Sequence, residues 1–249
     1  MNNVYLYDGS FSSLLALIEE IEELKLNVTN IKSTKEYSYN LLDETINLKI
    51  DNKKERIEQL KNKITNNILS TMYYVYLSCD NNKEMIIYNF YKLGKKYQNK
   101  VYNYRYIDSV NDSINISKYV SHEAHKLKGF LRFKETKNKF LYAKYKSNNN
   151  ILGILANHFK KRLSSEYFII YDEGRGNYAL YNKKKVIYLT EKDIIKLNLN
   201  FNSEEMFFED LWKTFFETIA IKERENKRAQ ISFMPKRYWE NILEMEDKL

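Results

Sequence analysis

The chain has 249 residues, 43% of them hydrophobic, which is enough for a buried core in one large domain or two small ones. Its formal net charge of +8 favours an anionic partner such as nucleic acid or an acidic membrane surface, although a composition rich in Lys, Asn, Ile and Tyr is also typical of an AT-rich genome. The single cysteine, Cys79, excludes an intramolecular disulfide and a cluster or zinc site held by cysteines of this chain alone.

The sequence also indicates where the protein resides. No run approaches the roughly 18 apolar residues of a membrane span. The N-terminus lacks the basic region and apolar core of a signal peptide. We therefore expect a cytoplasmic protein. Cys79 follows the apolar run 72–77, and we expect it to be a small buried hydrophobe rather than a reactive thiol.

The first half predicts one strand followed mainly by helices. Residues 4–7 predict a short buried strand, and Asp8-Gly9-Ser10 can break it and cap a helix. That helix carries an acidic run, which we expect to be a solvated face: Glu19, Glu20, Glu22 and Glu23. The elements expected next are strands at 26–31 and 45–50, a long helix from Asp51 toward Cys79, and helices at 82–97 and 108–126.

The second half has a different pattern. The expected strands are 129–134, 140–145, 167–172, 178–181 and 186–189, with a helix at 149–162. Asn202 and Glu205 predict a capping box for a helix whose apolar face holds Phe208, Leu211, Trp212, Phe215 and Ile219. Pro235 suits the first turn of a last short helix with Tyr238 and Trp239.

These elements predict an α+β fold. We expect a mainly helical region at 1–115 and a basic region at 116–249 with a small, mostly antiparallel sheet. No linker rich in Pro, Gly or Ser separates them, so one continuous compact unit is expected.

Residues 118–162 contain the main functional signal. They hold twelve basic residues against two acidic ones, Glu123 and Glu135, an excess of ten that is larger than the net charge of the whole chain. Aromatic residues are interleaved with them: Phe130, Phe133, Phe140, Tyr142 and Tyr145. Cations neutralise phosphates and aromatic rings stack on exposed bases, so the pattern favours nucleic acid. A basic sheet edge with core aromatics is the alternative.

All three histidines lie in the same segment. His122 and His125 would share a helix face, and His158 precedes Arg162 by four positions on another helix. The spacing does not match a zinc helix, and a metal would need a third ligand such as Asp172. Proton transfer or phosphate contact by His125 or His158 is an alternative to ordinary structural histidines.

A glycine-containing turn, Asp172-Glu173-Gly174-Arg175-Gly176, joins two predicted strands. Arg175 at its tip could reach a phosphate or stack on a base, or the turn could be a plain surface loop. No Walker or dinucleotide-binding pattern is present, and we expect no cofactor.

Several motifs together resemble a bacterial family described as probable DNA-metabolism proteins of unknown function. They include Tyr7-Asp8-Gly9-Ser10-Phe11, Glu123-x-His125-x-x-Lys128-Gly129-Phe130-Leu131-Arg132-Phe133, His158-Phe159-x-x-Arg162, Asp172-x-x-Arg175 and Met234-Pro235-x-Arg237-Tyr238-Trp239. The resemblance covers the N-terminal edge and most residues after Glu123. It implies a role beside a radical S-adenosylmethionine (radical SAM) protein that is similar to spore photoproduct lyase. It also implies a link to DNA repair or base modification, because longer relatives are fused to a uracil-DNA glycosylase-like domain.

Three hypotheses follow. The first is a DNA-binding accessory protein that grips single-stranded or damaged DNA and presents it to the radical SAM enzyme. Its expected contacts are Lys128, Arg132, Arg162 and Arg175, with Phe130, Tyr142 or Tyr145 stacking on bases. The second is a nucleic-acid-processing enzyme that uses His125 or His158 with Asp172 and the arginines. The third is a scaffold that binds a protein partner through Phe208, Trp212, Tyr238 and Trp239.

Overall fold

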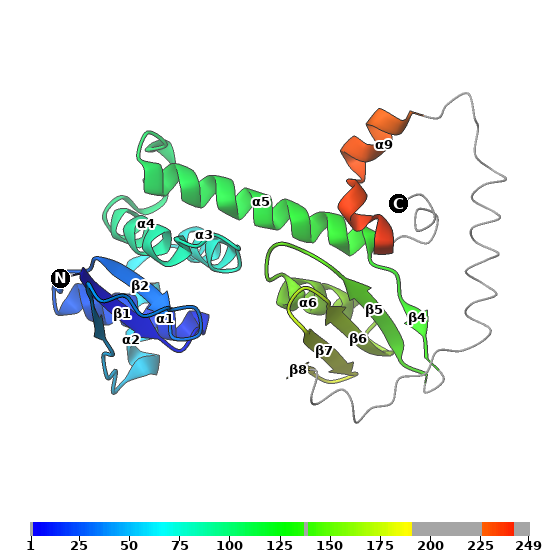
Figure 1. Ribbon diagram of the computed structural model, residues 1–249, viewed down its shortest axis with the longest axis horizontal. Helices are drawn as coiled ribbons and strands as arrows, with labels where there is room; N and C mark the ends of the chain where they lie inside the picture. The colour runs from blue at the N-terminus through cyan, green and yellow to red at the C-terminus, as the bar shows by residue number, and fades with distance from the viewer. Residues whose placement is uncertain (1, 137–138, 191–225, 242–249) are drawn as a thin grey trace. The chain divides into compact units, whose positions relative to one another are not determined.

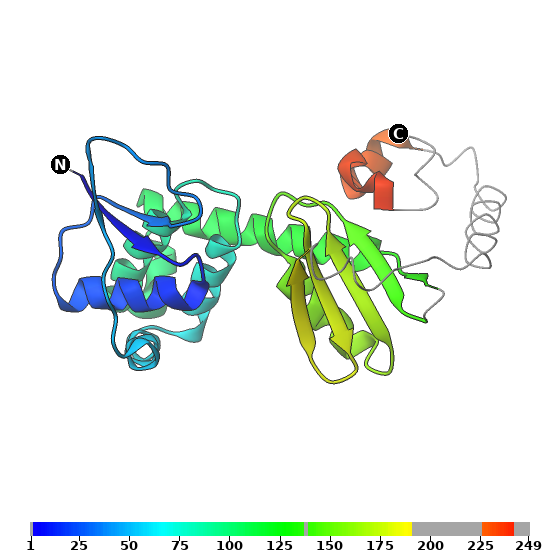
Figure 2. The same ribbon diagram turned by 60° about the horizontal axis from the view of Figure 1, so that its bottom comes forward.

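A computed structural model of the chain describes residues 2–136, 139–190 and 226–241. The chain divides into two compact units, Met1–Ser121 and His122–Leu249. Each unit combines helices with its own sheet, as the ribbon views show (Figures 1 and 2). The expected α+β class is therefore confirmed.

The first unit is built on a three-stranded parallel sheet. β1 (Asn2–Tyr7) lies between β2 (Asn30–Ser33) and β3 (Asp43–Ile46). The two outer strands correspond to the ranges predicted at 26–31 and 45–50, with shifted boundaries. The chain turns after β1 at Gly9, where φ is +85° and a Cβ would lie 2.8 Å from Ser33 Oγ. Only glycine adopts this turn without strain.

The helix after this turn begins as predicted. Ser10 caps α1 (Phe11–Glu23), and its Oγ accepts a hydrogen bond from the Ser13 amide at 3.2 Å. The prediction of a solvated acidic face is wrong at Glu19, which is fully buried. Other helices pack over this side chain, so Tyr91 donates a hydrogen bond to it at 2.6 Å and Lys63 forms an ion pair with it.

The long helix predicted from Asp51 toward Cys79 is two helices, α2 (Lys53–Lys63) and α3 (Asn66–Tyr76). They separate because Ile64 takes an extended conformation and Thr65 caps α3. α4 (Lys83–Tyr97) agrees with the prediction. The prediction that Cys79 is buried is wrong: its side chain is exposed, because α3 ends at Tyr76 and Cys79 falls in the turn before α4.

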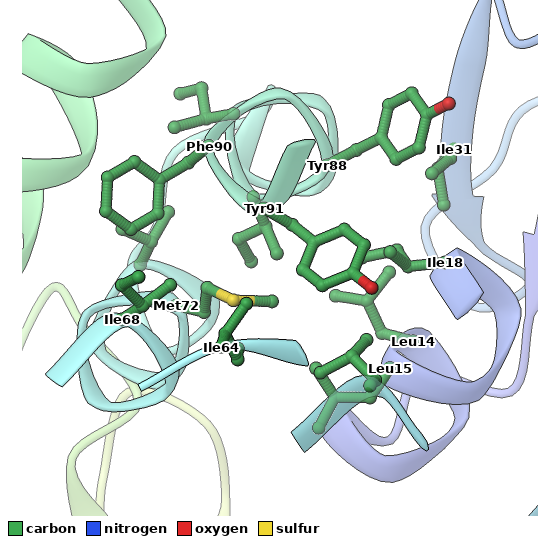
Figure 3. Close-up of a cluster of buried hydrophobic side chains, with 14 of the residues drawn as sticks. Leu14, Leu15, Ile18, Ile31, Ile64, Ile68, Met72, Tyr88, Phe90 and Tyr91 are labelled. Atoms are coloured by element: carbon green, nitrogen blue, oxygen red, sulfur yellow. The ribbon is translucent and has the colours of Figure 1, made fainter. Parts of the chain in front are cut away.

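The core of the first unit gathers side chains from α1, β2, α3 and α4 (Figure 3). Its fully buried members include Leu14, Ile18, Ile31, Ile68 and Phe90. Each such side chain stabilises the fold by about 1.5–3 kcal/mol relative to exposure. This core gives a firm base to the loops and helix ends that surround it.

α5 (Asp108–Phe130) begins in the first unit and ends in the second. It is longer than predicted, and the strand predicted at 129–134 is wrong for that reason. Buried apolar residues continue at helical spacing through Val120, Ala124, Leu127 and Leu131, and the Leu131 amide still donates to the Leu127 carbonyl at 3.0 Å. Only Lys134–Glu135 form a strand here, β4.

The second unit contains a five-stranded sheet in the order β4-β5-β6-β7-β8. Its longer strands are β5 (Leu141–Tyr145), β6 (Tyr167–Asp172), β7 (Asn177–Asn182) and β8 (Val186–Thr190). β5 and β6 are parallel and joined through α6 (Leu152–Arg162), whereas the other neighbours are antiparallel. The sheet is therefore mostly antiparallel, as expected.

α6 packs against one face of this sheet. Phe159 of α6 contacts Phe133, and Phe133 in turn contacts Phe168 of β6, with ring centroids 4.9 and 5.9 Å apart. The opposite face carries Ile169 and Tyr178 with partly buried neighbours. The alternation of the two faces follows the period of two along each strand.

Two short helices, α9 (Lys227–Phe233) and the 3-10 helix η4 (Lys236–Asn241), are described near the C-terminal end. Pro235 directly precedes η4, in agreement with the last predicted helix. The helix predicted after the Asn202–Glu205 capping box, with Phe208, Leu211, Trp212, Phe215 and Ile219, lies outside the described residues.

Candidate functional site

The few acidic groups of the basic segment are not all on its surface. Glu123, on α5, is 2% exposed. Its carboxylate accepts hydrogen bonds from the Asn149 amide at 3.2 Å, from the Asn149 side chain at 2.6 Å and from the Tyr238 hydroxyl at 3.3 Å. Arg237 adds an ion pair at 3.4 Å. The negative charge of Glu123 is thus bound by partners within the protein.

Asp172, at the end of β6, is also fully buried. Its Oδ2 accepts hydrogen bonds from the Tyr145 hydroxyl at 3.1 Å and from Arg175 at 3.3 Å. Its Oδ1 has no hydrogen-bond partner within the described ranges. Burial raises the pKa of this carboxyl, against the opposing effect of the Arg175 charge. Burial likewise raises the pKa of Tyr145, so its hydroxyl remains a proton donor.

The two carboxylates are linked through one loop, residues 147–149. Arg175 donates to the Ser147 carbonyl at 3.2 Å and to the Asn148 carbonyl. The backbone amides of Asn148 and Asn149 point instead to Glu123. Arg175, Asp172, Glu123 and Tyr238 therefore belong to a single buried network that joins four distant parts of the sequence. Its hydrogen bonds connect these four parts of the chain, while Asp172 Oδ1 has no partner among the described residues.

Positively charged side chains lie at the ends of two helices of the second unit. Lys128, near the end of α5, and Arg162, at the end of α6, both act on His158 of α6. Burial lowers the pKa of His158, and these two positive charges lower it further. Three of the residues expected from the sequence therefore interact electrostatically. Such a cationic group is suited to an anion.

The whole range 122–190 is strongly basic. Residues 122–190 contain fifteen basic and five acidic residues, whereas residues 1–121 contain sixteen and fifteen. Two of those five acids are the buried Glu123 and Asp172. Arg132 is exposed, with one guanidinium nitrogen bonded to the Gly129 carbonyl at 2.9 Å at the end of α5. Only three of the five acidic residues of this range therefore lie outside the buried core.

The expected stacking residues occupy different environments. Phe130 packs against Tyr238, with ring centroids 5.8 Å apart, and against Trp239. Tyr142 is partly buried on the sheet face that carries Ile169 and Tyr178, and burial raises its pKa to about 12. Tyr145 is fully buried and bonded to Asp172, so it serves the internal network rather than a stacking surface.

The proposed catalytic residues are not brought into contact. His122 and His125 are exposed on α5, and Asp172 pairs with Tyr145 and Arg175. No hydrogen bond between a histidine and Asp172 occurs in the part of the chain that the structure describes. In the same part, no group of three His, Cys, Asp or Glu side chains could hold a metal ion.

Sequence reasoning missed the internal role of Glu123, Asn149 and Tyr238. One signal was available: Glu123 is an isolated acid in a strongly basic segment, which suggests a buried partner. The partner itself could not be found, because Tyr238 lies 115 positions away.

Comparison with known families places most of this region in one domain. A family model described as DUF4130, a domain of unknown function, matches residues 81–244. No curated protein matches the chain. None of the helices that the structure describes is both long and apolar enough to cross a bilayer.

Proposed function

Because the chain belongs to the DUF4130 family of domains of unknown function, we propose its role from its own surface: it is a nucleic-acid-binding accessory protein. The observation that carries this proposal is the charge of residues 122–190, where fifteen basic residues stand against five acidic ones and two of the acids are buried. A surface of this kind attracts the phosphate backbone and releases counterions on binding.

Lys128, Arg132, His158 and Arg162 are the proposed phosphate contacts. Lys128 lies in the last turn of α5, and His158 and Arg162 lie on α6, so rigid helices hold these three backbones. Arg132 follows the end of α5 by two residues. Arg175 has a different proposed role, because its guanidinium already binds Asp172 and the loop at 147–149. It positions that loop through these contacts.

The cellular role of the binding comes from the family resemblance. We propose that the protein works in DNA repair or base modification and holds DNA for a separate radical SAM enzyme in the cytoplasm. A repair enzyme must reach atoms that are hidden in the base stack, so a partner that holds an unstacked strand is useful.

The two other hypotheses have less support. An enzyme using His125 or His158 requires a base oriented by Asp172, and Asp172 has other partners. In the scaffold hypothesis Trp239 would be an interface residue. Trp239 is 6% exposed, and its Nε1 donates to the Met234 carbonyl at 2.8 Å, so it belongs to the local core.

The test is charge reversal at the cationic helix ends. The double variant Lys128→Glu/Arg162→Glu should weaken binding to a fluorescein-labelled duplex or single strand and reduce the salt dependence by about two phosphates. The matched control is Lys54→Glu/Lys61→Glu on α2, which makes the same charge change at two exposed lysines of the first unit. Equal affinity of the folded double variant and the wild type would remove the proposal.

A further inference from the structure

The first unit contains a stretch with its own charge pattern. Residues 85–107 include no Asp or Glu but five basic residues, although residues 1–121 contain fifteen acids in total. The stretch covers most of α4, the 3-10 helix η1 (Gln98–Asn103) and the turn before α5. In Figure 1 the part of the stretch after α4 connects α4 to the start of α5. This basic stretch belongs to the first unit and is separate in the sequence from the basic range 122–190.

Three tyrosines in this stretch form a ladder of rings. Tyr97 packs against the core of the first unit. The Tyr104 ring lies 4.6 Å from the Tyr97 ring at an interplanar angle of 37°, and the Tyr106 ring lies 6.0 Å from Tyr104 at 72°. Tyr106 is 79% exposed. The ladder is therefore anchored at one end and open to solvent at the other.

The backbone of the ladder is fixed. Gln98 begins η1 with a φ of +50°, and Thr65 bonds the side chain of the next residue, Asn99, at 2.7 Å. The Tyr104 amide donates to Val101 and the Ile107 amide to Tyr104, both at 3.0 Å. A tyrosine has only two side-chain torsions, so binding to a preformed ladder costs little conformational entropy.

Positive charges flank the rings. The Lys96 ammonium lies 5.0 Å from the centre of the Tyr97 ring. Lys100 and Arg105 are exposed, and Arg105 stands between the two outer tyrosines in the sequence. Lys95 is excluded from this group because it pairs with Glu22 at 3.4 Å. Exposed rings together with cations match the two parts of a nucleic-acid strand, its bases and its phosphates.

We propose that this tyrosine ladder is a binding site for single-stranded nucleic acid. A base stacks on Tyr106, with Tyr104 at its edge, and Lys100 and Arg105 contact the adjoining phosphates. The site goes beyond the proposed function, because it lies on the first unit and uses none of Lys128, Arg132, His158 or Arg162. A regular duplex does not fit, because its bases are already stacked on one another.

The test compares strands with and without bases. The full chain is titrated by fluorescence anisotropy into a labelled thymidine oligonucleotide and into an abasic oligonucleotide of equal length. Tyr106→Ala should weaken thymidine binding about tenfold, as expected for the loss of one base–aromatic stack, and leave abasic binding unchanged. Tyr106→Trp should retain thymidine binding. A uridine oligonucleotide shows whether RNA or DNA supplies the preferred bases.

Tyr39→Ala is the matched control, because Tyr39 is also 79% exposed in the first unit and lies outside the ladder. Thermal unfolding verifies that each variant is folded. Unchanged thymidine binding by Tyr106→Ala, or an equal loss on the abasic strand, would overturn the ladder site. The Lys128→Glu/Arg162→Glu variant separates the two proposals. It should bind both the thymidine and the abasic oligonucleotide more weakly, whether or not the ladder binds bases.

Discussion

The Tyr238 hydroxyl donates a hydrogen bond to Glu123 at 3.3 Å, and this bond ties the C-terminal 3-10 helix to α5 across 115 positions of the sequence. Burial raises the pKa of Tyr238 to about 12, so the hydroxyl keeps its proton and remains a donor at neutral pH. Both residues are buried, so if this hydrogen bond is removed, bulk water cannot replace the missing partner.

Tyr238→Phe should therefore destabilise the second unit by about 1–2 kcal/mol, the usual cost of leaving a buried acceptor without one donor. The measurement is urea unfolding followed by tryptophan fluorescence. Tyr188→Phe, at an exposed strand position, is the control and should change the unfolding free energy little. Equal stabilities of Tyr238→Phe and the wild type would show that the bond contributes nothing to the fold.

Arg175→Ala should destabilise the protein by about 3 kcal/mol or more, because it removes the charge partner of a fully buried carboxylate. Adding Asp172→Asn to this variant should recover part of the loss, since the uncompensated charge disappears. A double-mutant cycle in thermal unfolding measures the coupling. Strictly additive effects of the two substitutions would contradict the internal role of Arg175.

His158 predicts a pH dependence of binding. Its pKa lies below the ordinary value of 6.5, because of burial and the charges of Lys128 and Arg162. A bound phosphate offsets those charges and raises the pKa, so affinity should increase as the pH falls from about 7.5 to about 5.5. In the unbound protein the sign is opposite: the unfolded chain takes up the proton more readily below 6.5, so stability decreases as the pH falls through this window.

His158→Gln should remove part of this increase in affinity, whereas His122→Gln should keep it, because His122 is exposed on α5 six positions before Lys128. Anisotropy titrations at the two pH values measure the difference. Identical pH profiles for both variants would separate His158 from the binding surface.

Much of the fold was predictable because local signals were strong. The Ser10 cap of α1 and the continuous apolar run of β6 each specify one element. The boundary at Gly129 was not predictable from propensity, since the buried spacing through Leu131 overrides the glycine. Cys79 was misplaced because an apolar run does not indicate where its helix ends.

The candidate site was predictable only in its charge. The excess of Lys and Arg is a property of composition, and the charges of Lys128 and Arg162 both act on His158. The buried pairs of Glu123 and Asp172 depend on contacts between residues far apart in the sequence, and no local pattern encodes them. The tyrosine ladder was missed because its rings meet through the turn of η1 rather than through helical or strand spacing.

The most direct test of nucleic-acid binding is an anisotropy titration of the full chain with single-stranded and duplex DNA over a series of salt concentrations. We predict that the logarithm of the binding constant falls linearly with the logarithm of the salt concentration. The slope should correspond to several phosphates and should be smaller for Lys128→Glu/Arg162→Glu. Absence of binding to either DNA at low salt would contradict the account, and the basic surface of the second unit would then have no role in holding nucleic acid.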